Sequence, residues 1–195
     1  MPKLGMEPIR RQTLVAATIA EIGAAGSLEV TMSQIARRAG VSSALAHHYF
    51  GSKDKLFLAA MRTVLTDFGT EAREALAGQT DPQARLRAIV QTCFAPASFR
   101  PGVVAAWLNF YVHALNSDAT LRLLRLYRRR LHSNLVHDLR PLVGAQAEEI
   151  AETTGALIDG LYIRQALKSD GPLADAAVRH VMAYLDLAIA AGSRA

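Results

Sequence analysis

The sequence predicts an all-α fold of about nine helices, separated by short breaks at Gly and Pro. Three observations support this fold class. Apolar residues make up 51% of the 195 residues but aromatic residues only 6%, and Ala, Leu and Arg are frequent, which suits packed helices. Apolar residues also recur at helical spacing in long segments. Finally, the stretch from residue 31 to 56, TMSQIARRAGVSSALAHHYFGSKDKL, contains two helix caps close together.

The first helix is expected over residues 7–25. Pro8 suits the first turn of a helix, and Ile9 opens an apolar face that continues at helical spacing. Gly23 and Gly26 are expected to end this helix, because glycine favours helix termini over helix interiors.

The capped stretch predicts a helix, a tight turn and a second short helix. Thr31 and Gln34 form a capping box that starts the first of these helices. Gly40 supplies the left-handed backbone that stops it, and Ser42 caps the next helix. Two helices joined by so short a turn form a helix-turn-helix, which places its second helix in the major groove of DNA. A plain helical hairpin is the alternative.

Helical angles predict which side of the second helix faces outward. At about 100° per residue, counted from Leu45, both Tyr49 and His48 lie toward the core. The opposite face is expected to be short, small and polar, formed by Ser43 and His47 with Ala44 and Ala46 on its flanks. Such a face can approach base edges closely.

Basic residues flank this motif. Lys53 and Lys55 follow it, where they can reach phosphates, and Lys3, Arg10 and Arg11 form an N-terminal arm that can lie along DNA or enter a minor groove. The net charge of +5 and the pI near 9.7 favour a polyanionic partner.

The motif GVSSALAHHYFGSKDKLF resembles the signature of the TetR-type repressors, with G-V-S, then Y-F, then Lys and Leu at matching spacing. This resemblance implies that Tyr49 and Lys53 contact the DNA backbone, while Ser43, Ala44 and His47 face bases. Angles and resemblance together predict these DNA-binding residues: Thr31, Ser42, Ser43, Ala44, His47, His48, Tyr49, Lys53, Lys55, Arg10 and Arg11.

After the motif, a long helix is expected over residues 53–77, with Leu56, Ala60 and Val64 near one face. A break at 78–82 precedes a helix over 82–94, and the segment 96–101 turns the chain. The helix over 118–139 carries a row of arginines. We interpret this row as a solvated basic face, with a second nucleic-acid patch or a membrane-surface helix as alternatives.

The helix that begins near Gly102, VVAAWLNFYVHAL, places Trp107, Phe110 and Tyr111 on one face. These rings either pack in the core or form an aromatic cage, which attracts quaternary ammonium groups. AWLNFY resembles the matching stretch of the choline-responsive repressors of betaine synthesis, the BetI subgroup of the TetR family, and the opening PKLGM-x-x-x-RR is also similar. The resemblance implies that the three rings bind a ligand.

The last two helices are expected over residues 146–167 and 173–190. Both are apolar, and Gly155 and Gly160 allow close approach, so they can pack against a second copy or be buried within one chain. Reading DNA favours the dimer, because two recognition helices about 34 Å apart read a near-palindrome. The TetR resemblance implies the same arrangement.

Asp159 interrupts the first of these apolar helices, near Tyr162. A carboxylate there needs a partner, either an arginine such as Arg164 or a cationic ligand. GALIDGLYIRQAL resembles the corresponding stretch of the choline-responsive repressors, so the resemblance covers almost the whole chain. The predicted ligand-binding residues are Trp107, Phe110, Tyr111, Asp159 and Tyr162.

No pattern indicates catalysis, a metal or a cofactor. The six histidines form no H-E-x-x-H pair, and no Gly-rich phosphate loop is present. Cys93 is the only cysteine, which excludes an intrachain disulfide and favours a reducing cytoplasm. No signal-peptide core and no apolar run long enough for a membrane span are found in the sequence.

The sequence therefore predicts two domains: residues 1–52 bind DNA, and residues 53–195 bind a ligand and dimerise. The predicted function is a ligand-responsive transcriptional repressor that binds double-stranded DNA as a homodimer. The resemblance implies choline as effector and glycine betaine synthesis genes as targets. A TetR-type repressor for another organic cation or an apolar molecule is one alternative. A helical metabolite-binding protein or enzyme without DNA binding is the other.

Overall fold

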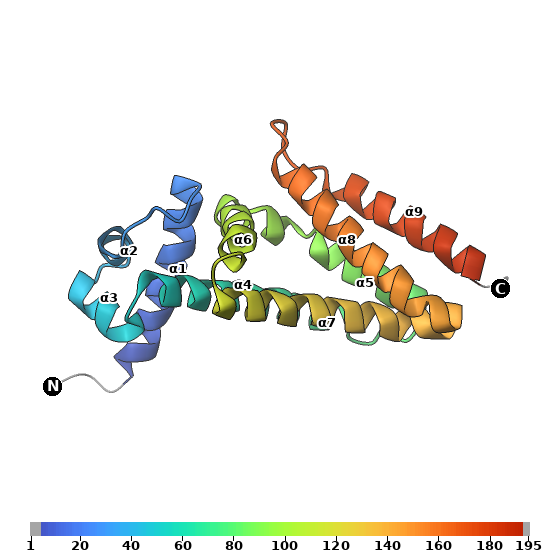
Figure 1. Cartoon of the computed structure of the whole chain (residues 1–195), viewed down its shortest axis with the longest axis horizontal. Coiled ribbons are helices and arrows are strands. Elements are labelled where there is room, and N and C mark those ends of the chain that lie inside the picture. The colour runs from blue at the N-terminus through green and yellow to red at the C-terminus, as the bar shows by residue number, and fades with distance from the viewer. Residues whose placement is uncertain (1–4, 193–195) are drawn as a thin grey trace. The chain divides into compact units, whose positions relative to one another are not determined.

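The computed structural model describes residues 5–192, which form nine α-helices, two short 3-10 helices and no strand (Figure 1). The α-helices are α1 (Met6–Ala25), α2 (Met32–Arg38), α3 (Ser43–Phe50), α4 (Lys53–Leu76), α5 (Pro82–Cys93), α6 (Pro101–Ala114), α7 (Asp118–Val143), α8 (Ala147–Ala166) and α9 (Ala174–Gly192). The 3-10 helices are η1 (Pro96–Phe99) and η2 (Gly144–Gln146). The predicted all-α class is confirmed. None of the described helices is long and apolar enough to cross a bilayer.

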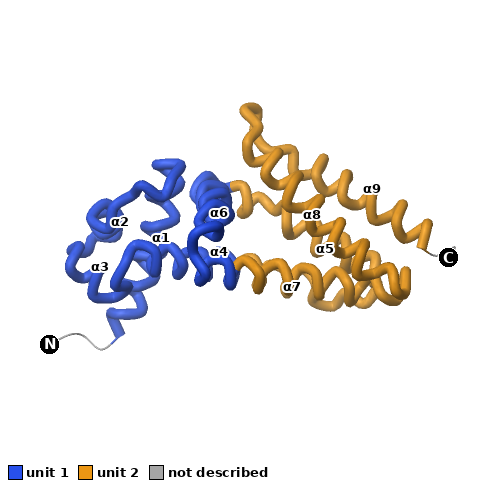
Figure 2. Tube along the Cα trace, viewed as in Figure 1, with its two compact units in different colours: residues 1–66, 100–123 blue, residues 67–99, 124–195 orange. Residues whose placement is uncertain are grey.

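The chain divides into two compact units (Figure 2). Unit 1 contains the residues up to Thr66 together with Arg100–Leu123, and unit 2 contains Asp67–Phe99 and the residues from Leu124 onward. The division differs from the predicted boundary after residue 52, because the first part of α4 and all of α6 belong with the N-terminal helices. Whether DNA binding and ligand binding separate at residue 52 stays a prediction.

Local hydrogen bonds form the predicted helix-turn-helix within unit 1. The Gln34 amide donates to the Thr31 hydroxyl at 3.2 Å, and the Thr31 amide donates to the Gln34 side-chain oxygen at 2.7 Å, so the capping box is complete. Gly40 adopts φ 67°, which an L side chain rarely adopts. The Ser42 hydroxyl then accepts from the Leu45 amide at 3.2 Å and caps α3.

Helices α1 and α6 cross at a pair of glycines in unit 1. A Cβ atom built on Gly23 would lie 2.5 Å from Gly102 Cα and 2.9 Å from Gly102 N, so neither helix could approach as closely with a side chain there. The Asn109 side chain adds a hydrogen bond to the Gly26 carbonyl at the end of α1. The predicted end of α1 at Ala25, with Gly26 as its terminator, is confirmed, but Gly23 lies inside the helix and does not end it.

In unit 2, α5, α8 and α9 pack together, and α7 pairs with α5 through a buried ion pair between Asp138 and Arg85. Helix α7 continues through Pro141 to Val143, four residues beyond its predicted end at 139. Proline usually ends a helix because it lacks an amide hydrogen, but Val143 is buried and lies against the position of Gly192 in α9. Tertiary packing therefore keeps the last turn.

Candidate nucleic-acid interface and ligand site

Helix α3 faces the core through Ala46, which has no exposed surface. The angular prediction took Leu45 as the centre of the inward face. It is wrong in placing Ala46 beside the outward face and His48 toward the core, because Ala46 is buried and His48 is exposed. Taking Ala46 instead of Leu45 as the centre of the buried face places Ala44 and His48 on the opposite side of the helix. Of the predicted base readers, Ala44 and His47 are exposed and Ser43 is half-buried, and His48 is exposed beside them.

Two of the polar side chains on α3 already make hydrogen bonds. The Ser33 hydroxyl donates to the Ser43 hydroxyl at 3.3 Å, which links the two helices of the motif. The His47 Nδ1 atom lies 3.2 Å from the Gly51 carbonyl oxygen at the end of α3. Thr31 and Ser42 are exposed, but each hydroxyl accepts the cap hydrogen bond of its own helix.

Arg11 holds the end of α3 against α1. Its guanidinium donates to the Tyr49 carbonyl at 2.7 Å and to the Glu7 carboxylate at 2.8 Å, and it lies 5.2 Å from the centre of the Tyr49 ring. The Arg11 guanidinium is thus held by contacts within the protein, whereas Arg10 is exposed. Lys3 lies outside the described residues.

The two lysines after the motif differ in their surroundings. Lys53 is half-buried, and its ammonium donates to the Leu28 carbonyl at 2.8 Å, which fastens the start of α4 to the chain between α1 and α2. Lys55 is exposed, two residues further along α4. Of the two predicted phosphate contacts, Lys55 is the more exposed residue, and Lys53 also has a structural role that sequence reasoning missed.

The three predicted ligand rings of α6 lie together in unit 1. The Trp107 ring centre is 5.9 Å from that of Tyr111, with 31° between their planes, and 5.7 Å from that of Phe110, which it meets edge-on. Trp107 retains 8% exposure and Tyr111 is half-buried, but Phe110 has none. Phe110 therefore supports Trp107 from the core, and Trp107 and Tyr111 offer the more accessible faces.

The C-terminal end of α6 contacts the first turn of α4. His113 Nδ1 lies 2.8 Å from the Thr120 hydroxyl, and its Nε2 lies 3.7 Å from an Asp54 carboxylate oxygen. The His113 ring also meets Phe57 of α4 edge-on at 5.4 Å. Helix α6 thus touches the element that follows the helix-turn-helix directly, as well as α1.

The other predicted ligand residues, Asp159 and Tyr162, lie on α8 in unit 2. Asp159 pairs with Arg128 of α7 at 3.6 Å, rather than with the predicted Arg164. The Tyr162 hydroxyl donates to the Ser98 carbonyl at 2.8 Å, and burial raises the pKa of this phenol, so it stays neutral. The Tyr162 ring stacks on Phe99 at 5.3 Å. Sequence reasoning missed Phe99, because it lies in the short η1 segment rather than in a periodic helix.

Cys93 is unsuited to nucleophilic chemistry. Burial, together with a smaller effect of the nearby Asp159 charge, raises the pKa of its thiol to about 12, so the thiol is protonated at neutral pH. Within residues 5–192, no three His, Cys, Asp or Glu side chains are placed to hold a metal ion.

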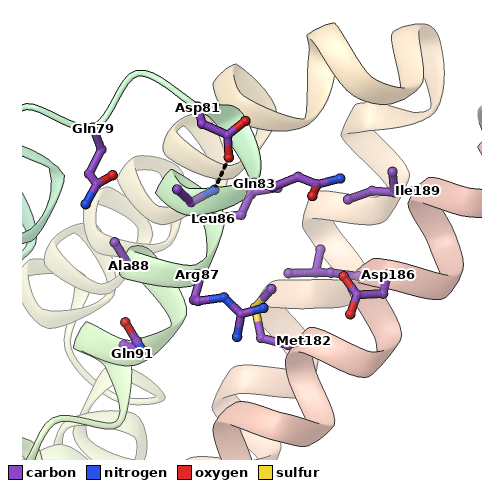
Figure 3. Close-up of a pocket in the computed structure, with 12 residues that line it drawn as sticks. Gln79, Asp81, Gln83, Leu86, Arg87, Ala88, Gln91, Met182, Asp186 and Ile189 are labelled. Carbon is purple, nitrogen blue, oxygen red and sulfur yellow. Dashed lines mark hydrogen bonds between the residues drawn. The ribbon is translucent and has the colours of Figure 1, made fainter.

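Unit 2 also has a surface pocket of about 370 Å³ between α5 and α9 (Figure 3). Leu86, Met182 and Leu185 line it together with glutamines, and Arg87 and Asp186 stand on opposite sides. No aromatic ring lines this pocket, and none of the predicted ligand residues does. It therefore lacks the ring faces that attract a quaternary ammonium group.

A capped helix-turn-helix with small and polar side chains on its second helix, joined to further helices, defines a DNA-binding transcriptional regulator. The family described as "Bacterial regulatory proteins, tetR family" matches residues 14–60, and the family described as "BetI-type transcriptional repressor, C-terminal" matches residues 82–190. The chain belongs to the TetR family and is a transcriptional repressor of the BetI type.

Named relatives and solved structures agree with this assignment. The HTH-type transcriptional regulator BetI of Brucella suis biovar 1 is 54% identical over 95% of this chain and 94% of its own. The BetI regulator of Agrobacterium fabrum is 54% identical over 87% of this chain and 82% of its own.

Among solved structures, a transcriptional regulator from Pseudomonas aeruginosa PAO1 has a TM-score of 0.85 at 26% identity, covering 98% of this chain and 95% of its own. A regulator from Saccharomonospora viridis, solved in complex with choline, has a TM-score of 0.80 at 23% identity over 90% of this chain and 95% of its own, and that likeness shows the fold. The relatives are regulators, not enzymes.

Proposed function

We propose that this repressor controls genes of glycine betaine synthesis and releases its operator when it binds choline. The relatives named BetI match nearly the whole chain, and a regulator of the same fold was solved with choline. The observation that carries the proposal is the pair of neighbouring rings, Trp107 at 8% exposure and the half-buried Tyr111, on a helix packed directly against α1 of the DNA-binding helices. Because its partner is chromosomal DNA, we place the protein in the cytoplasm.

The contacts of α6 provide a route by which a bound ligand would affect DNA binding. A choline ammonium on the Trp107 and Tyr111 rings would favour one position of α6 over another. Helix α6 meets α1 at Gly102 and meets the first turn of α4 through His113. A movement of α6 would therefore change the position of the helix-turn-helix. The ligand acts only through its difference in affinity for the two positions, and a few kcal/mol is enough.

In unit 2, Asp159 is the acidic candidate for a cationic ligand. Its carboxylate already pairs with Arg128, so a bound cation would share or replace that partner. The neighbouring Phe99 and Tyr162 rings add an aromatic surface. We keep Asp159 and Tyr162 as proposed ligand residues and add Phe99.

We further propose that the protein is a homodimer formed through α8 and α9. Leu187 on α9 is 74% exposed and Leu167, directly after α8, is 68% exposed, which is unusual for large apolar side chains. Gly155 and Gly160 on α8 have nothing within 4 Å of an added Cβ, which leaves room for a second copy. A two-fold dimer would present two α3 helices to a near-palindromic operator.

Leu187→Glu is expected to dissociate the dimer, because it places a charge in the apolar interface. Sedimentation velocity should show a monomer at micromolar concentration, and affinity for the operator should fall at least tenfold, since only one α3 helix then binds at a time. The control is Leu126→Glu, at an exposed leucine of α7. An unchanged dimer in the Leu187 variant would place the interface elsewhere.

The proposed function is tested by a gel shift on the DNA upstream of its own gene, with and without choline. A shift that choline reverses supports the proposal. If choline does not reverse the shift but another organic cation or an apolar molecule does, the protein is still a ligand-responsive repressor, and choline is wrong as its effector.

Trp107→Ala is expected to abolish the choline response while DNA binding without choline is retained. The substitution removes the largest ring face, and cation–π contact depends on that face. Trp107→Phe keeps a smaller ring and should require more choline for half-release, by several-fold. The measurement is a choline titration of the gel shift. Release of the Trp107→Ala variant at the wild-type choline concentration would contradict the aromatic site.

A further inference from the structure

The recognition helix has few side chains that can form hydrogen bonds with bases. Helix α3, SALAHHYF, contains no Arg, Lys, Asn or Gln, the residues that most often read base edges in the major groove. Its polar side chains are Ser43, His47, His48 and Tyr49. Ser43 is half-buried against Ser33, and the Tyr49 ring packs beneath Arg11. Direct readout by α3 therefore depends mainly on its two imidazoles.

One of these imidazoles lies within hydrogen-bond distance of a backbone carbonyl oxygen. His47 Nδ1 lies 3.2 Å from the Gly51 carbonyl oxygen, and a carbonyl oxygen can only accept a hydrogen bond. A hydrogen bond between these two atoms requires the hydrogen on Nδ1, and in a neutral imidazole this tautomer leaves the other nitrogen, Nε2, with a lone pair. In this tautomer, the exposed His47 has an acceptor for DNA at Nε2.

We propose that His47 reads an exocyclic amino group in the major groove, N6 of adenine or N4 of cytosine, through Nε2 as acceptor. In the major groove only adenine and cytosine present an amino donor, whereas guanine and thymine present acceptors at the corresponding edge. An acceptor at His47 therefore favours A or C and disfavours G or T. The inference depends on the proposed placement of α3 in the major groove and assigns the chemistry of one contact there.

The test begins with selection of binding sites from random DNA at about pH 8.5. The wild type, His47→Ala and Lys55→Ala are compared. His47→Ala should lose the preference for A or C at one position of each half-site. Lys55→Ala, which removes an exposed charge, should keep every preference and bind all sequences more weakly.

Single-atom changes in the selected site then separate acceptor from donor. Replacing the adenine by purine removes the amino group and keeps N7, while 7-deazaadenine removes N7 and keeps the amino group. If the position selects cytosine, 2-pyrimidinone removes its amino group. Loss of the amino group should weaken wild-type binding about five- to tenfold and leave His47→Ala unchanged. Loss of N7 should leave the affinity of both the wild type and His47→Ala unchanged.

Three results would overturn the inference. They are an unchanged base preference in His47→Ala, a wild-type preference for G or T at that position, and a dependence on N7 in place of the amino group. If the wild type selects no sequence at all, the sequence-specific DNA function fails as well, which distinguishes that failure from an error in the chemistry of His47. Retained weak binding to random DNA shows that His47→Ala is folded.

Discussion

Gly23→Ala is expected to lower the free energy of unfolding by about 2 kcal/mol and the melting temperature by roughly 4–8 °C. The new methyl group would lie 2.5 Å from Gly102 Cα and 2.9 Å from its amide nitrogen. Both neighbours are backbone atoms of α6, so they can yield only if the two helices move apart. This cost exceeds the gain of up to about 1 kcal/mol that alanine normally brings to a helix. Thermal unfolding followed by circular dichroism measures the effect.

Gly69→Ala is the matched control. Gly69 is also within a helix, α4, but an added Cβ there meets nothing within 4 Å. This variant should therefore be as stable as the wild type or up to about 1 kcal/mol more stable. If both variants gain stability alike, the close crossing of α1 and α6 is wrong.

Arg85→Met is expected to destabilise the protein by about 3 kcal/mol, because it leaves a buried carboxylate without its cation. Asp138 is 2% exposed, and its Oδ1 accepts from Arg85 Nε at 2.7 Å and from His137 Nδ1 at 2.8 Å. Its Oδ2 is buried and has no hydrogen-bond partner among the described residues, so the carboxylate has little to replace Arg85. Urea unfolding should show a lower midpoint with an unchanged slope.

The double variant Arg85→Met, Asp138→Leu separates a lost ion pair from lost packing. Removing both charges eliminates the unpaired carboxylate, so stability should return to within about 1 kcal/mol of the wild type. A double variant as unstable as Arg85→Met would show that packing of the arginine stem, and not the buried charge, accounts for the effect.

Short-range features of the helix-turn-helix were predictable from the sequence. The capping box, the Ser42 cap and the left-handed Gly40 each depend on residues within three or four positions of one another, so sequence and local geometry are enough. The orientation of α3 was not predictable in the same way. It has only eight residues, and whether Leu45 or Ala46 faces inward depends on the helices packed against it.

In the candidate sites too, contacts between residues close in the sequence were predictable and contacts between distant residues were not. Sequence spacing correctly brought Trp107, Phe110 and Tyr111 together, because Phe110 and Tyr111 lie three and four residues after Trp107 on a single helix. It could not reveal that Arg11 holds the Tyr49 carbonyl, that Lys53 holds the Leu28 carbonyl, or that Arg128 pairs with Asp159. These partners lie 25 or more residues apart in the chain, and no local pattern encodes such contacts.

By itself, the sequence determined the helical class, the DNA-reading motif and the repressor family, since these follow from caps, periodicity and motif spacing along the chain. Only the tertiary structure showed which side of α3 faces outward and which basic side chains form hydrogen bonds within the protein. It also showed that α6 packs with the DNA-binding helices. The physical reason is that burial and hydrogen-bond partners depend on segments distant in the chain. In the helix-turn-helix, the structure shows His47 Nδ1 beside the Gly51 carbonyl oxygen, and on this geometry rests our proposal that Nε2 of His47 contacts a base.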